Sequence, residues 1–264
     1  MFYHKAKKSL GQNFLKSKSA LKTIIETGQI TPEDTIIEIG PGKGALTEHI
    51  LQSGATLIAI EKDDELFAYL SDKYQEYIST KKLTLIHSDI LDLDDSFFKL
   101  PTKNYKLIAN IPYNITGQII RKFLTATHKP RDIVLLVQKE VSDRIVARDG
   151  KESLLSLSVK LYGTPKYIKK VPARDFSPAP KVDSAILHIK DIQKPNLTPQ
   201  EETLFFDVLH AGFAHKRKVL TSNLSLKFPK EKVLALFSKL SLNEKVRAED
   251  LTLSQWVDIT RSLS

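Results

Sequence analysis

Short apolar runs alternate with helical patterns along the first part of the chain. The apolar runs read DTIIEIG, ATLIAIEKD, KLTLIHSD, KLIAN and DIVLLVQ, and they begin at residues 34, 55, 82, 106 and 132. Between and after them, the segments GALTEHILQSG, DELFAYLSDKYQEYI, GQIIRKFLTA and KEVSDRIVAR carry apolar residues at helical spacing. This alternation is typical of βαβ units, so it predicts a mainly parallel sheet with helices on its faces.

Two later runs predict how the sheet ends. PKYIKKVP (165–172) and KVDSAILHIK (181–190) lie close together in the sequence and follow the helix-like SLLSLSVKLYG (153–163). They suit a final hairpin, antiparallel, at an edge of the sheet. We therefore assign residues 1–190 to one α/β domain.

The pattern changes after residue 190. DIQKPNLTPQ (191–200) is polar, has two prolines and lacks periodicity, so we place a linker at residues 191–198. EETLFFDVLHAGFAHKRKVLTSNL, KEKVLALFSKL and TLSQWVDITRSL then carry helical spacing, with Thr198 and Thr252 as candidate N-caps. Residues 199–264 are predicted to form a small all-helical domain.

Charge and composition restrict the classes of partner and site that the chain can have. The 264 residues contain 40 Lys and Arg against 31 Asp and Glu, a net charge of +9, which favours a polyanionic partner. The absence of cysteine excludes thiolate catalysis and cysteine-ligated zinc, and the seven histidines form no H-x-x-x-H pair, so we expect no metal site. No apolar window is long enough to cross a membrane, and MFYHKAKKSLGQN lacks a signal-peptide pattern. We expect a cytoplasmic monomer that does not bind membranes.

The segment EIGPGKGALT (38–47) joins a strand end, a glycine-rich turn and a helix start. Such a turn lets the backbone approach a ligand at the carboxyl edge of a sheet. Gly40, Gly42 and Ala45 match the dinucleotide fingerprint G-x-G-x-x-A, and the acidic Glu61 follows about 20 residues later. A nicotinamide dinucleotide of an oxidoreductase is one candidate ligand, and a tight turn without a ligand is the alternative.

Two acids favour S-adenosylmethionine over a dinucleotide. Glu38 ends a strand where a carboxylate suits a cationic ligand end and would repel a pyrophosphate. Asp89 ends the third strand, in place to bind an adenine amino group while Glu61 accepts from both ribose hydroxyls and Ile90 packs on the adenine face. The alternative role for Asp89 is a helix or turn cap.

The segment IANIPYNITG (108–117) places Asn110 at the end of the fourth strand, and Pro112 restrains the chain beyond it. The Asn110 side-chain oxygen and the Ile111 carbonyl suit the two N–H groups of an adenine amine, whose lone pair then points at a methyl donor. Tyr113 would stack on the base, a contact worth about 1–3 kcal/mol. Methyl transfer of this kind is a direct displacement that needs positioning and no general base. The alternative is an Asx-type turn beside a core tyrosine.

These motifs occur together and in order: GQNFL (11–15), EIGPGKGALT, Glu61, Asp89, NIPYN (110–114) and FSPAPKVDS (176–184). As a set, they resemble the rRNA adenine N6-dimethyltransferases over nearly the whole chain. The resemblance implies a Rossmann-like class I methyltransferase with a mainly parallel seven-stranded sheet, an antiparallel last strand and a helical C-terminal domain that helps grip RNA. It also implies that Asn13, Leu15, Gly40, Glu61, Asp89 and Asn110 contact S-adenosylmethionine. Phe176 is implied as the second aromatic that, with Tyr113, sandwiches the target base.

Two subfamilies share this pattern. HKRKVLTSNL, VRAEDLTLSQW and KVDSAILHI resemble KsgA, whereas NIPY followed by NITGQIIRKF is more similar to Erm. We favour KsgA, because the tail matches span more positions. That choice implies dimethylation of two adjacent adenines near the 3′ end of 16S rRNA, within a small ribosomal subunit or its precursor. The Erm alternative implies one adenine of 23S rRNA and macrolide resistance.

Two further functions are compatible with these motifs, a ribosome-assembly factor without turnover and an enzyme that methylates adenine in DNA. Basic clusters at both ends of the chain fit an RNA-binding role. We expect RNA contacts from Lys7 and Lys8 in the N-terminal arm (residues 1–18) and from Lys216, Arg217 and Lys218 in the tail.

Overall fold

The computed structural model describes residues 4–7, 10–98 and 105–264 of the chain. Its contacts divide the chain into two compact units. Unit 1 comprises residues 1–142 and 163–193, and unit 2 comprises residues 143–162 and 194–264. Within the described residues, no helix is long and apolar enough to cross a membrane.

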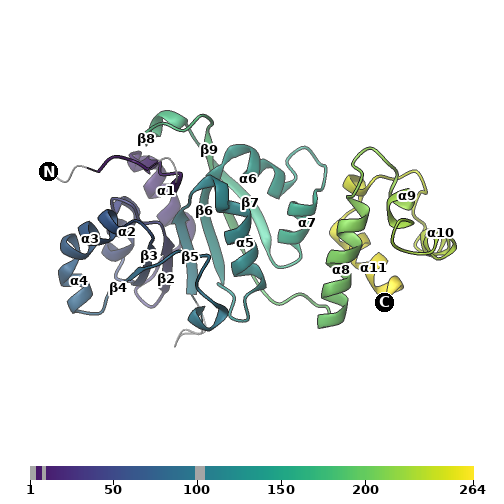
Figure 1. Cartoon of the computed structure of the whole chain (residues 1–264), viewed down its shortest axis with the longest axis horizontal. Helices are drawn as coiled ribbons and strands as arrows, with labels where there is room; N and C mark the ends of the chain where they lie inside the picture. The colour runs from purple at the N-terminus through teal and green to yellow at the C-terminus, as the bar shows by residue number, and fades with distance from the viewer. Residues whose placement is uncertain (1–3, 8–9, 99–104) are drawn as a thin grey trace. The chain divides into compact units, whose positions relative to one another are not determined.

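Unit 1 is built on a seven-stranded sheet with the order β4-β3-β2-β5-β6-β9-β7 (Figure 1). The strands are β2 (Thr35–Ile39), β3 (Thr56–Glu61), β4 (Leu83–His87), β5 (Tyr105–Asn110), β6 (Asp132–Gln138), β7 (Thr164–Val171) and β9 (Ser184–Lys190). The first five are parallel, and β9 is antiparallel to β6 and to β7. The predicted parallel sheet with an antiparallel last strand is confirmed. β9 lies inside the sheet, and β7 forms the edge of the final hairpin.

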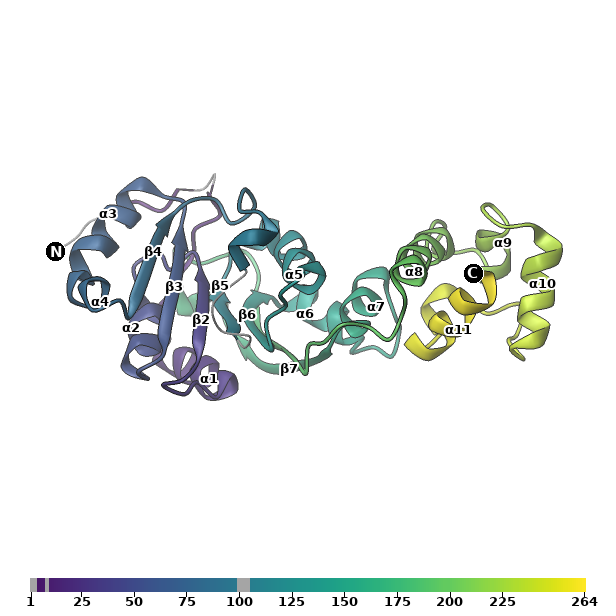
Figure 2. The same ribbon diagram turned by 90° about the horizontal axis from the view of Figure 1, so that it is seen from below.

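Helices cover both faces of this sheet, as its apolar strands require. They are α1 (Lys18–Gly28), α2 (Ala45–Gln52), α3 (Asp64–Lys73), α4 (Gln75–Ser79) and α5 (Thr116–Thr125). Helix α6 (Lys139–Val146) follows β6, and its residues are divided between the two units. Figure 2 shows α1 and α2 on one face and α5 on the other. On the first face, Ile24 of α1 and Ile50 of α2 are fully buried in one apolar cluster with strand residues such as Ile108.

The helical pattern at residues 64–78 forms two helices, with the break at Tyr74. The Tyr74 hydroxyl donates to the backbone carbonyl of Gly44, 2.9 Å away, at the start of α2. Continuous helical spacing alone does not predict this break or this contact, which joins positions 30 apart in the sequence.

Unit 2 is all-helical. Its helices are α7 (Leu154–Lys160), α8 (Pro199–Gly212), α9 (Leu220–Leu224), α10 (Lys230–Lys239) and α11 (Leu253–Leu263). Trp256 and Phe205 are fully buried at its centre. Thr198 and Thr252 cap α8 and α11 with capping boxes, which confirms both predicted N-caps.

Residues 143–162 group with unit 2, whereas the predicted boundary put them in the first domain. The physical reason is apolar burial, because Leu157 of α7 belongs to the same core as Phe205 and Trp256. The Tyr162 hydroxyl also donates to the Glu202 carboxylate on α8. The segment 191–198 contains no helix or strand and ends at the cap of α8. That the units are separate folding domains stays a prediction.

Gly212 offers a test of packing in unit 2. A Cβ added there would lie 2.4 Å from Trp256 Cη2 and 2.9 Å from Leu220 Cδ1. We expect Gly212→Ala to lower the free energy of unfolding by about 1–3 kcal/mol, because overpacking outweighs the better helix propensity of alanine. Urea unfolding followed by the fluorescence of Trp256, the single tryptophan, measures this.

The matched control is Gly117→Ala in α5, where an added Cβ meets no heavy atom within 4 Å. This variant should lose no stability by circular dichroism. Equal effects of the two substitutions would contradict the packing argument.

Candidate active site at the carboxyl edge of the sheet

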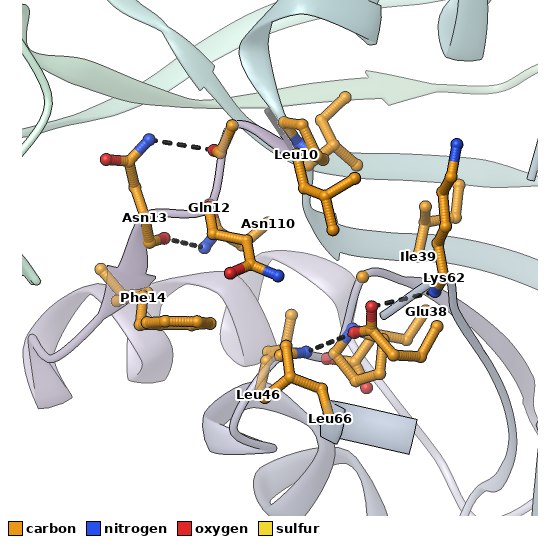
Figure 3. A pocket seen from close by; sticks show the side chains of 18 of the residues that line it. Leu10, Gln12, Asn13, Phe14, Glu38, Ile39, Leu46, Lys62, Leu66 and Asn110 are labelled. Atoms are coloured by element: carbon orange, nitrogen blue, oxygen red, sulfur yellow. Dashed lines mark hydrogen bonds between the residues drawn. The ribbon is translucent and has the colours of Figure 1, made fainter. Parts of the chain in front are cut away.

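A cavity of about 470 Å³ lies at the carboxyl edge of the sheet in unit 1. The ends of β2, β3, β4 and β5 line it, together with residues 10–16 of the N-terminal arm. Figure 3 shows Glu38, Lys62 and Asn110 around this space, with Asn13 and Phe14 from the arm. The predicted site residues that line it are Asn13, Leu15, Glu38, Gly40, Gly42, Glu61, Asp89, Ile90, Asn110, Ile111, Pro112 and Tyr113.

The glycine loop forms the cavity wall between β2 and α2. Gly40 and Gly42 have φ angles of 62° and 61°, which favour glycine. A Cβ at Gly40 would meet no heavy atom within 4 Å, so the backbone there faces open space. A Cβ at Gly42 would lie 3.0 Å from the Phe14 ring, so this glycine lets the arm pack against the loop.

Glu38 is 1% exposed and accepts a hydrogen bond of 2.7 Å from the Thr47 hydroxyl. Burial raises the pKa of Glu38 to about 8, and the nearby negative charge of Glu61 adds to the shift. The group is therefore largely protonated near neutral pH. A cation entering the cavity would supply the counter-charge that favours the ionised form.

Glu61 binds backbone with both of its oxygens. Oε1 accepts from the N–H groups of Lys62 and Asp63, each at 2.9 Å, and Oε2 accepts from Gly42 N–H at 3.1 Å. Burial raises the pKa of Glu61 despite these three hydrogen bonds. A carboxylate has about four lone-pair positions, so one remains, on Oε2. Accepting both ribose hydroxyls at once, as predicted, requires one backbone N–H to be released.

Asp89 follows β4 and forms a salt bridge with Lys62, 2.7 Å from Nζ to Oδ2. Oδ1 accepts from Leu91 N–H at 2.9 Å, which is a turn cap. Burial acts to raise the pKa of Asp89, but the bonds from Lys62 and Leu91 outweigh it and lower the pKa. Ile90 is buried beside it and lines the cavity. Asp89 therefore caps the turn and also lines the cavity. Lys62 was missed in the sequence, because a lysine after an acid carries no signal of its own.

Asn110 is the last residue of β5, as predicted. Its side-chain Nδ2 donates to the backbone carbonyl of Asn13, 3.1 Å away (Figure 3). The amide nitrogen is thus engaged by the arm, and Oδ1 is the atom left to act as an acceptor. Tyr113 begins a short 3₁₀ turn, η3 (Tyr113–Ile115), and its hydroxyl lies 2.5 Å from Ser184 Oγ.

Polar contacts hold the N-terminal arm over the cavity. Gln12 Nε2 donates to Asp63 Oδ2 at 3.0 Å, and Gln12 Oε1 accepts from Lys7 N–H at 2.7 Å. The other oxygen of Asp63 caps α3. Burial acts to raise the pKa of Asp63, but hydrogen bonds from Lys7 and Gln12 outweigh it and lower the pKa. Gln12 and Asp63 were not predicted as site residues, because their pairing joins positions 51 apart in the sequence.

Phe176 lies in the apolar core of unit 1 and is not among the residues that line the cavity. It belongs to β8 (Phe176–Ser177), which pairs with β1 (Phe14–Leu15) in the arm. Its ring is 2% exposed and belongs to the apolar core of unit 1. Its role as the second aromatic around the target base, with Tyr113, stays a prediction. Its neighbour Ser177 lines the cavity instead.

The basic residues predicted to bind RNA lie in different environments. Lys7 Nζ lies 3.0 Å from Asp63 and 3.4 Å from Glu65, so its charge is engaged within the arm contacts. Lys8 lies outside the described residues. Lys216, Arg217 and Lys218 are exposed between α8 and α9 in unit 2, and we call them the basic loop.

Comparisons with known proteins find similar sequences over most of the chain. Residues 3–264 match the family model described as ribosomal RNA adenine dimethylase. A relative from Dehalococcoides mccartyi (strain CBDB1), named ribosomal RNA small subunit methyltransferase A, is 41% identical over 254 residues, which cover 96% of this chain and 86% of the relative.

Two solved structures have a similar fold over most of their length. A dimethyladenosine transferase from Plasmodium falciparum is 26% identical with a TM-score of 0.78, over 93% of this chain and 95% of that one. The 23S rRNA methyltransferase ErmE is 23% identical with a TM-score of 0.77, over 95% of this chain and 99% of that one. At that identity, the likeness to ErmE shows the fold alone.

The raised pKa of Glu38 predicts how stability changes with pH. Between the ordinary value of 4.5 and about 8, the folded protein keeps a proton that the unfolded chain has released. The free energy of unfolding should therefore fall as pH rises through this window, by at most about 1.4 kcal/mol per pH unit for this group. Glu38→Gln keeps an acceptor for Thr47 and should flatten that slope.

Urea unfolding from about pH 5 to about pH 8 measures the slope. Glu33→Gln, which changes an exposed acid in the same unit, should keep the wild-type slope. Equal slopes for wild type and Glu38→Gln would show that Glu38 is ionised in the folded protein.

Proposed function

The chain belongs to the ribosomal RNA adenine dimethylase family, and on this basis we propose that it transfers methyl groups from S-adenosylmethionine to the N6 amine of adenine in rRNA. The product is N6,N6-dimethyladenine. The small-subunit relative at 41% identity supports a KsgA-type substrate, two adjacent adenines near the 3′ end of 16S rRNA in a small subunit or its precursor. The Erm alternative has the weaker support, because the likeness to ErmE extends to the fold alone.

The hydrogen bonding of the Asn110 side chain is the observation on which this proposal rests. Its Nδ2 is bound to the Asn13 carbonyl, which leaves Oδ1 as an acceptor on the cavity wall. An adenine amine offers two N–H donors, and Oδ1 and the adjacent Ile111 carbonyl are the two acceptors we assign to them. A hydride-transfer reaction gives no role to such a pair, so the arrangement favours an amine substrate over a nicotinamide reaction.

The cavity fits S-adenosylmethionine by its donor set. Gly40 leaves open backbone, Glu61 and Asp89 provide acceptors at neighbouring strand ends, and Ile90 provides an apolar surface. We assign the ribose to Glu61 and the adenine to Asp89 and Ile90. Asn13 and Leu15 close the site from the arm, and Glu38 faces the cationic end with Gly42 beside it. When bound, this cofactor supplies a methyl group on a positively charged sulfur.

The protein's contribution to the reaction is positioning. Accepting both N–H groups of the amine orients its lone pair, and Pro112 and Tyr113 hold the base beside Asn110. After one methyl group is added, the amine still has one N–H for these acceptors, so the same geometry serves the second transfer. Neither step needs a general base in the transition state, because the neutral amine attacks and loses its proton afterwards.

We assign the basic loop to contacts with RNA phosphates. Its three cations are exposed, and the segment from His215 to Lys218 contains no acidic residue that could pair with them. Lys7 is assigned a structural role in the arm instead, because its ammonium already pairs with two carboxylates.

The direct test is methylation. The wild-type protein with labelled S-adenosylmethionine should label small-subunit particles or their rRNA, and mapping should find dimethyladenine near the 3′ end. Label confined to 23S rRNA would support the Erm alternative, label in DNA would identify a DNA enzyme, and cofactor binding without any transfer would indicate an assembly factor.

Asn110→Ala should lower the methylation rate by about 10²–10³, by analogy with loss of one transition-state hydrogen-bond partner. Cofactor affinity measured by calorimetry should weaken only severalfold, through the lost bond to Asn13. Asn196→Ala, at an exposed position of unit 2, serves as the control and should methylate normally. A near-normal rate for Asn110→Ala would remove the role assigned to that amide.

Charge reversal of the basic loop tests RNA binding. The triple variant Lys216→Glu, Arg217→Glu and Lys218→Glu should bind rRNA more weakly and reduce the slope of log affinity against log salt by about 2–3. Reversal of Lys230, Lys239 and Lys245, three exposed lysines of unit 2, gives the same net charge. If both triple variants behave alike between about 50 and about 200 mM salt, the effect is general charge and not a local contact.

A further inference from the structure

The FSPAPKVDS segment ends in a buried serine to which the proposed chemistry assigns no role. Ser184 is the first residue of β9 and is 0% exposed. In the sheet it lies opposite Gln138 of β6 and Val171 of β7. Because Gln138 ends β6, Ser184 is held at the same carboxyl edge as Asn110.

The Ser184 hydroxyl contacts one side chain of the site. Its Oγ lies 2.5 Å from the Tyr113 hydroxyl, and either group can be the donor. Tyr113 is half-buried and lines the cavity. Burial raises the pKa of Tyr113, so the phenol stays protonated near neutral pH and the contact is a hydrogen bond between neutral groups.

The backbone around Ser184 is held on several sides. The preceding residue, Asp183, accepts from Ala173 N–H at 2.9 Å and pairs with Lys170 Nζ at 2.8 Å. Its carbonyl accepts from Lys139 N–H, also at 2.9 Å. Ser184 is therefore a fixed point in the sheet, whereas Tyr113 lies in the short η3 turn that follows Pro112.

We propose that Ser184 is a positioning residue for methyl transfer, which fixes the Tyr113 ring beside Asn110 by binding the Tyr113 hydroxyl. The inference rests on the proposed function and names a further residue of the same site. Because its side chain is fully buried, Ser184 acts through Tyr113 and does not touch the substrate. Tyr113 lines the cavity, whereas Phe176 is buried in the apolar core of unit 1.

A double-mutant cycle tests this role. Ser184→Ala and Tyr113→Phe should each lower kcat/KM for rRNA about three- to tenfold, the size of one lost hydrogen bond, with KM for S-adenosylmethionine unchanged. The double variant should be no slower than either single variant, because both act on the same bond. It should also be at least as stable as Ser184→Ala, because no buried hydroxyl is left unpaired.

The control is Ser142→Ala in α6. Ser142 is also fully buried in unit 1, and within the described residues its hydroxyl has no hydrogen-bond partner. Its kcat/KM should equal that of wild type. Wild-type kinetics for Ser184→Ala, or a double variant whose loss is the product of the single losses, would overturn the inference.

A second measurement does not depend on methylation. In protein labelled with fluorotyrosine, the ¹⁹F signal lost in Tyr113→Phe identifies Tyr113 among the eight tyrosines. That signal should shift or broaden in Ser184→Ala and stay unchanged in Ser142→Ala. An unchanged signal in Ser184→Ala would overturn the inference even if the enzyme is active. A wild-type protein that methylates no rRNA would overturn the proposed function, while the ¹⁹F signal would still show whether Ser184 holds Tyr113.

Discussion

The parallel pairing of β2, β3, β4 and β5 is the constraint on which the site depends. Strands that run in the same direction end at the same edge, so Glu38, Glu61, Asp89 and Asn110 meet although the sequence separates them. Three of these residues are acids, and each is accommodated differently. Glu38 is largely protonated, Glu61 binds three backbone N–H groups, and Asp89 pairs with Lys62. The cavity can therefore hold three carboxyl groups without three free negative charges.

Most of the sheet and much of the cavity wall could be predicted from local patterns. The alternation of apolar runs and helical segments indicated the parallel strands, and acids or amides directly after those runs marked the shared edge. The position of Asn110 at the end of β5 and the N-caps Thr198 and Thr252 are confirmed, because each depends on a few neighbouring residues.

The features that could not be predicted are contacts between distant segments. The pairing of Gln12 with Asp63 and the burial of Phe176 both depend on how the N-terminal arm packs against the folded sheet. The grouping of residues 143–162 with unit 2 depends likewise on a core assembled from later helices. An amphipathic pattern shows that a helix buries one face, and it does not show against which unit.

The bond from Asn110 Nδ2 to the Asn13 carbonyl has a consequence for the evolution of this site. A carboxamide is nearly symmetric in shape, and rotation by half a turn would exchange its oxygen with its NH₂ group. The rotated form would present donors to an amine that itself donates, and the two would repel. The arm backbone thus decides the polarity of the amide. Because a main-chain carbonyl does this, this particular contact depends on the chain path at position 13 and not on the identity of its side chain.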